Sequence, residues 1–140
     1  MITAAILIAM TDDITGLTLD HNAFWEEPPL AKDGKPAQGV WITTRGGNQT
    51  NAKGINNATT ADIYASFDNR IKTEEIHAEI ADWIKSHPTI CKLSGTVGGS
   101  SYEFTNVRIR PATSPSTYGI TENGNIVKIA SALIYYDINQ

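Results

Sequence analysis

The sequence predicts one α+β domain, in which an N-terminal helix and one central helix pack on a mostly antiparallel sheet with long β-hairpin-like loops. Three observations favour this class. A helical stripe of apolar residues lies in mid-chain, strand-like segments precede and follow it, and two long polar connections, Arg45–Thr60 and Pro111–Asn125, separate neighbouring strands. A length of 140 residues fits a single domain, spanning residues 1–140.

The N-terminal segment MITAAILIAM predicts an amphipathic helix that packs on the sheet and ends near Gly16. It is too short to span a bilayer, lacks a basic start and is followed at once by Asp12 and Asp13. We therefore expect neither a signal peptide nor a membrane anchor here. The expected buried face consists of Ile2, Ala5, Ile6, Ala9 and Ile14.

Three extended segments are expected next. Leu17–Trp25 predicts a short extended segment, and Gly39–Thr44 and Ala61–Asp68 predict strands, because β-branched and aromatic residues are frequent in them. The turn-forming runs PP and DGKP separate the first two.

The central helix gives the clearest signal in the sequence. Thr73 is expected to cap its N-terminus, with Glu74 and Glu75 in the first turn, where the helix dipole favours acids. Pro88 is expected to end it. Its apolar stripe, spaced by three and four residues, consists of Ile76, Ile80, Trp83 and Ile84.

Two strands are expected after this helix. Ser101–Arg110 alternates, so Arg108 and Arg110 share one side of the strand. Ile126–Ile138 carries large apolar residues on one side and the small Ala130 and Ala132 on the other. The predicted element order is helix, strand, long loop, strand, helix, strand, long loop, strand.

Both long loops are polar and rich in turn-forming residues. Such segments bury too little apolar surface to offset the entropy lost on ordering, so we expect a partner chain to hold them. Loops of this length inside a compact domain are usually functional or disordered. The residues expected to contact a partner from these loops are Arg45, Asn48, Gln49, Lys53 and Tyr118.

The net charge is −4, which argues against a global nucleic-acid-binding surface, but the charges are unevenly placed. Acids dominate Asp62–Asp82, whereas Arg108 and Arg110 lie in an acid-free stretch. One interpretation is that both are solvated faces. The other is that the two acid-free loops share a face that meets a partner or a polyanion. Guanidinium groups suit carboxylates of a neighbouring subunit as well as phosphates, so Glu74 and Glu75 in the acidic segment are expected to meet Arg108 and Arg110 of the next copy.

No catalytic signature is present. The sequence has no GxSxG, Walker A or HExxH motif, and its histidines and single cysteine lack zinc-ligand spacing. Gly98-Gly99 precedes a strand rather than a helix, so a tight turn is expected instead of a phosphate-binding loop. Cys91 is expected to be a small buried hydrophobe in a protein made in a reducing compartment. We expect no enzyme activity, no metal and no cofactor.

The order of these segments resembles a known family. An apolar N-terminal helix is followed by a segment ending in Pro-Pro, the strand QGVWITTRGG (38–47), an acidic amphipathic helix and the final strand IVKIASALIYY (126–136). Nearly the whole chain is similar in this way to the tail terminator proteins of long-tailed bacteriophages, also called tail completion or minor capsid proteins.

The resemblance implies a structural virion protein at the head-proximal end of the tail, assembled in the host cytoplasm. Such proteins form a ring, commonly a hexamer, that caps the tail tube, ends its polymerisation and joins the tail to the head connector. The implied partners are further copies of the chain, the tail tube protein and a connector or neck protein, with DNA passing through the lumen and no membrane contact. The alternatives are another phage neck or head-completion protein, or a small ligand-binding α+β module.

Overall fold

A computed structural model of the chain describes residues 1–26, 38–48, 57–112, 116–120 and 125–138. Two helices accompany a curled seven-stranded sheet with strand order β1-β2-β3-β7-β5-β4, and β6 also pairs with β7. Among the strand pairs of the described residues, β1 and β2 run parallel and the others antiparallel, so the α+β class and the mostly antiparallel sheet are as predicted. The elements are α1 (Ile2–Asp13), β1 (Ala23–Trp25), β2 (Gly39–Asn48), β3 (Asn57–Ser66), α2 (Arg70–Ser86), β4 (Thr89–Val97), β5 (Ser100–Pro111), β6 (Ser116–Ile120) and β7 (Ile126–Ile138).

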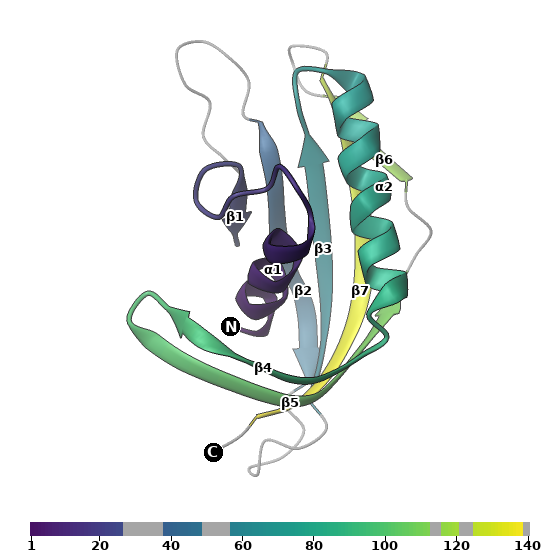
Figure 1. Cartoon of the computed structure of the whole chain (residues 1–140). Coiled ribbons are helices and arrows are strands. Elements are labelled where there is room, and N and C mark those ends of the chain that lie inside the picture. Colours follow the sequence, from purple (N-terminus) through teal and green to yellow (C-terminus); the bar gives the residue numbers. More distant parts are fainter. Residues whose placement is uncertain (27–37, 49–56, 113–115, 121–124, 139–140) are drawn as a thin grey trace.

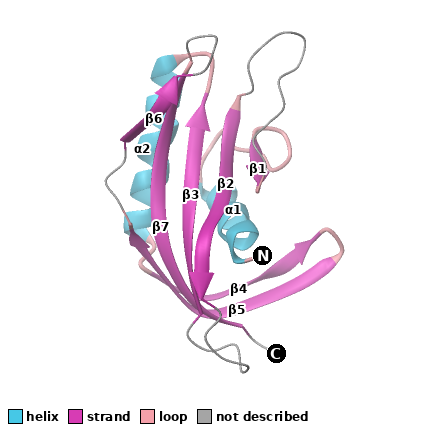
Figure 2. Ribbon diagram, turned by 180° about the vertical axis from the view of Figure 1, so that it is seen from behind, coloured by secondary structure: helices cyan, strands magenta, loops and turns pink. Residues whose placement is uncertain are grey.

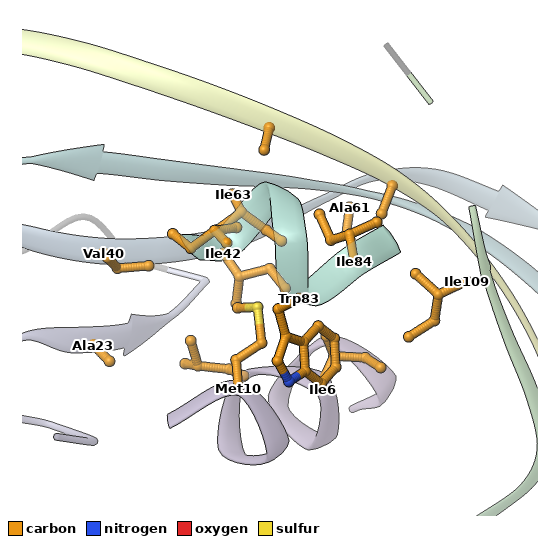
Figure 3. Packing of buried hydrophobic residues seen from close by; sticks show 14 of the residues in the cluster. Ile6, Met10, Ala23, Val40, Ile42, Ala61, Ile63, Trp83, Ile84 and Ile109 are labelled. Carbon is orange, nitrogen blue, oxygen red and sulfur yellow. The ribbon is translucent and has the colours of Figure 1, made fainter. Parts of the chain in front are cut away.

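Both helices lie on the same side of the sheet, and the β4–β5 hairpin bends round toward α1 (Figure 1). Seen from behind, the strands lie in front of the helices (Figure 2). One hydrophobic cluster draws residues from both helices and from the sheet. In this cluster the side chains of Ile6 and Met10 from α1 and Trp83 from α2 gather below Ile42 and Ile63 of the sheet (Figure 3).

The helix α1 differs from the amphipathic helix that the sequence predicts. Thr3, Ala4 and Leu7 are buried along with the expected Ile2 and Ile6, so the burial extends well beyond one face. Contacts with β1, β2 and β4 explain this, because the hairpin that reaches α1 covers a second side of the helix. A helix that is apolar on most sides is suited to such a position.

The helix α2 begins earlier than predicted. The side chain of Asn69, rather than that of Thr73, caps it by accepting hydrogen bonds from the Ile71 and Lys72 amides at 2.9 and 3.3 Å. Glu74 and Glu75 are therefore in the second turn, and their expected place in the first turn was wrong. Thr73 is fully buried and hydrogen-bonds to the backbone of Phe67 instead. The predicted stripe of Ile76, Ile80, Trp83 and Ile84 is confirmed as buried, and the helix ends at Ser86, just before Pro88.

The predicted long loops are largely strand in the described residues. Residues 45–48 continue β2 and residues 57–60 begin β3, with a register shift between Thr44 and Gly47. In the second loop, Pro111 belongs to β5, and β6 pairs with β7. The connections are hairpin-like as predicted, but their strands extend further into the expected loops. The remaining loop residues lie outside the described part of the chain.

The strand β4 was not predicted, and it forms one edge of the sheet. Gly98 and Gly99 follow it with φ angles of 57° and 82°, which confirms the predicted tight turn. Cys91 in β4 is exposed, so its expected burial was wrong. The reason is that an edge strand on a hairpin has few neighbours, and residues between its half-buried Ile90 and Leu93 face solvent.

The small-residue side of β7 faces the core. Ala130 and Ala132 are each 2% exposed, whereas Leu133 and Tyr135 on the other side are half-buried. Small side chains let a neighbouring layer approach the strand closely. The His77 ring of α2 approaches β7 in this way, and its Nε2 lies 2.9 Å from the Ile129 carbonyl oxygen.

Candidate interaction surfaces

The predicted partner-contacting residues fall on separate parts of the fold. Arg45 and Asn48 lie in β2, Tyr118 in β6, Glu74 and Glu75 in α2, and Arg108 and Arg110 in β5. Gln49 and Lys53 lie outside the described residues, as do the side chains of Asn48 and Tyr118. Among those whose side chains the structure describes, Arg108 lies near Arg110 on β5, and Glu74 precedes Glu75 on α2.

Arg45 contacts an acid of its own chain. Its Nε lies 3.0 Å from Oδ2 of Asp62, whose side chain is only 7% exposed. Ser131 donates a hydrogen bond of 2.5 Å to the other carboxylate oxygen of Asp62. These three residues tie β2, β3 and β7 together, so Asp62 is a structural acid rather than part of an exposed acidic surface. The register that pairs Thr43 with Asp62 and Asp62 with Ser131 could not be read from the sequence.

The side of the sheet opposite the helices, which we call the helix-free face, carries aligned rows of side chains. One row crosses three strands from Trp41 through Tyr64 to Ile129, and the two aromatic rings stack with centroids 5.2 Å apart. These three residues are half-buried. A sheet face of this kind retains apolar and aromatic surface that water contacts.

Two further rows on the helix-free face end in arginine. Thr60 pairs with Leu133, which pairs with Arg110, and Tyr135 pairs with Arg108. The Arg108 guanidinium carbon lies 5.4 Å from the centre of the Tyr135 ring, a cation–π contact that orients the side chain. Arg108 Nε is buried without a hydrogen-bond partner among the described residues, and Arg110 is exposed. The predicted shared side of the two arginines is confirmed.

The outer surface of α2 is acidic. We define it by five exposed residues that recur at helical spacing on the side away from the buried stripe: Ile71, Glu75, Ala78, Glu79 and Asp82. Ile71 is 66% exposed, which is unusual for a large aliphatic side chain. Glu74, beside this surface, forms an ion pair with Arg70 at 3.3 Å. No salt bridge within the described residues involves Glu75, Glu79 or Asp82.

The histidines hold structural positions. His87 caps the C-terminus of α2, stacks on Trp83 and places Nε2 at 3.4 Å from Asp13 Oδ2. His77 contacts a backbone carbonyl, as described above, and His21 is exposed in a turn. Among the residues that the structure describes, no group of three or more His, Cys, Asp or Glu side chains could hold a metal ion. The Ser86 hydroxyl lies 3.2 Å from His87 Nδ1, but it donates to the Trp83 carbonyl oxygen, which His87 Nδ1 also faces at 2.8 Å.

The described residues contain no helix long and apolar enough to cross a membrane. The chain matches no protein-family model and no curated protein. The functional argument therefore depends on the surfaces of the molecule and on the resemblance noted in the sequence.

Proposed function

We propose that this protein is a tail terminator of a long-tailed bacteriophage, a structural virion protein that forms a ring on the end of the tail tube. One observation carries the proposal. A single subunit presents two unlike exposed surfaces, the acidic outer surface of α2 and the arginine-bearing helix-free face, on opposite sides of its sheet. A heterologous contact needs two such surfaces, and repetition of one rotation closes a ring.

Further features of the chain suit this role. The segments that connect β2 to β3 and β6 to β7 are polar in sequence and rich in amide and hydroxyl side chains, a composition that suits contacts with a neighbouring ring. The excess of acids over bases, 15 against 11, also suits a lumen through which DNA passes, because phosphate affinity rises with each charge that is neutralised. In this role the ring caps the tube, stops its growth and joins the tail to the connector, in the virion of a phage assembled in the host cytoplasm.

The test is assembly on tail tubes. The purified protein is added to the polymerising tail tube protein of the same phage, and tube lengths are measured by electron microscopy. We expect shorter tubes, each with a ring at one end, and a hexamer is the expected ring. Tubes that grow to the same length without bound protein would contradict the proposal, and a stable monomer that binds a small molecule would favour a ligand-binding module.

A further inference from the structure

We propose that the outer surface of α2 of one copy packs across the helix-free face of the next copy, with Glu75 and Glu79 opposite Arg110 and Arg108. This inference rests on the proposed ring and names the contact that builds it. The occupant of the helix-free face is thus a second copy of this chain.

The receiving surface has the composition of an interface. Aromatic residues and arginine are enriched at the centres of protein–protein contacts. Trp41, Tyr64 and Tyr135 lie on the helix-free face together with Arg108, and all four are half-buried in the single chain. The helices cover only the other side of the sheet, so a third layer can complete the fold on this side.

The outer surface of α2 carries side chains that suit packing against the helix-free face. Ile71 and Ala78 lie two turns apart on the outer surface of α2, and both are exposed. Ala78 has a small side chain, so the helix backbone can approach a sheet closely around it. Ile71 projects beyond it and provides apolar surface for the half-buried Ile129 and Leu133.

The spacing of the charges matches as well as their sign. Glu75 and Glu79 are four residues apart on a helix, which corresponds to about 6 Å along its axis. Arg108 and Arg110 are two residues apart on a strand, which corresponds to about 6.6 Å. Two acids and two bases can therefore meet as pairs when α2 runs along β5, and bidentate contacts with guanidinium groups are available to each carboxylate.

A second copy explains both surfaces at once. The two surfaces lie on opposite sides of the same sheet, so they cannot meet within one chain. The contact is head-to-tail, so a copy that has used one of its two surfaces still offers the other, and each further copy joins in the same way. A different protein bound to the helix-free face would leave the acidic outer surface of α2 without an explanation.

Charge reversal tests the pairing. Glu75→Lys and Arg110→Glu are each expected to weaken self-association at least tenfold, measured by sedimentation velocity over a range of concentrations. The double variant, with both charges reversed, is expected to recover most of the wild-type association. Asp12→Lys and Lys92→Glu make the same charge changes elsewhere and are expected to leave association unchanged.

Cross-linking tests the geometry independently of charge. In a Cys91→Ser background, Ala78→Cys combined with Leu133→Cys is expected to give a disulfide-linked ladder of dimers, trimers and larger species, in solution or on tube ends. Each single cysteine is expected to give no more than the reducible dimer formed by chance collision. A double-cysteine variant that forms no ladder while it assembles normally overturns the inference.

The two proposals fail differently. A ring that still forms and still caps tubes after charge reversal overturns this interface and leaves the tail terminator role intact. If the unmodified protein neither self-associates nor binds tube ends, the proposed function itself is wrong and the interface falls with it. Association of the helix-free face with a different protein, blocked by Arg110→Glu but not by Glu75→Lys, also overturns the inference.

Discussion

The indole nitrogen of Trp83 donates a hydrogen bond of 2.8 Å to the carboxylate of Asp13, and this contact joins the C-terminal ends of the two helices. His87 adds to the junction, because its Nδ1 lies 2.8 Å from the Trp83 carbonyl oxygen and its Nε2 faces Asp13. The two residues linked by the indole contact are separated by 70 positions in the chain. The junction therefore fixes how α1 and α2 lie relative to each other.

Removal of the Asp13 carboxylate should loosen this junction. We expect Asp13→Ala to lower the free energy of unfolding by about 1–2 kcal/mol, because the mostly buried indole N–H of Trp83 loses its acceptor. Urea denaturation followed by tryptophan fluorescence measures the change. The neighbouring Asp12→Ala is the control and should stay within about 0.5 kcal/mol; equal effects of the two variants would contradict the role of the hydrogen bond.

Replacement of the Asp62 carboxylate should lower the stability of the fold more than replacement of the Asp13 carboxylate. Asp62→Ala is expected to lower the free energy of unfolding by about 1–3 kcal/mol, since the Ser131 hydroxyl loses its acceptor in a buried position. Arg45→Ala should cost less than about 1 kcal/mol, because the arginine side chain is 60% exposed and its ion pair is screened by water. An Arg45 variant as unstable as the Asp62 variant, in thermal or urea unfolding, would show that the ion pair dominates.

Gly39 is held where a side chain does not fit. Its φ is +140°, and a Cβ there would lie 2.6 Å from the backbone oxygen of Asn22. Gly39→Ala should therefore cost more than about 2 kcal/mol, from backbone strain together with displacement of β1. Gly16→Ala is the matched comparison, because Gly16 has a φ of +93° with no atom within 4 Å of the added Cβ, and about 1 kcal/mol is expected from strain alone. If the two variants lose similar amounts of unfolding free energy in urea, the proposed clash between the Cβ at position 39 and the Asn22 oxygen is wrong.

The stability of the fold should depend on the Tyr102 hydroxyl at alkaline pH. Burial raises the pKa of Tyr102 above its ordinary value of 10.0, and the charge of Asp12 raises it further. The folded state thus holds this proton more tightly than the unfolded chain does. The resulting stabilisation is complete below pH 10.0 and is lost as the pH rises from there through the folded-state pKa.

Tyr102→Phe removes the titrating group and keeps the ring that stacks on Phe104. We expect the free energy of unfolding of this variant to fall less steeply above pH 10 than that of the unmodified protein, measured by urea denaturation at closely spaced pH values. Parallel curves for the two proteins would contradict the assignment. Asp12→Asn should produce a smaller change in the same direction.

The sequence determined the fold class because its strongest patterns are local. The stripe of Ile76, Ile80, Trp83 and Ile84 needs only helical spacing to be recognised, and its burial is observed. Thr73 is a good capping residue by type, but in the structure the Phe67 amide donates to its hydroxyl, and Asn69 accepts from the first amides of the helix instead. The strand β4 was missed because TICKLSGTV lacks clear alternation, as befits an edge strand whose outer side faces water.

The candidate surfaces were partly predictable. A period of two residues places Arg108 and Arg110 on one side of a strand whatever the rest of the fold does. The acid opposite Arg45 could not be predicted, because the Asp62 contact depends on the pairing of β2 with β3 and of β3 with β7. Local charge counts included Asp62 in an acidic surface, whereas tertiary structure removes it from solvent.

The position of β7 has a consequence for how the domain folds during synthesis. This strand ends the described chain, yet it lies between β3 and β5 in the middle of the sheet. During translation the earlier strands leave the ribosome before the strand that joins them, so the native sheet closes only after β7 has been made. A prematurely terminated product would present two separate β-sheets with open edges to chaperones and proteases. Only chains that contain β7 would then form the complete sheet.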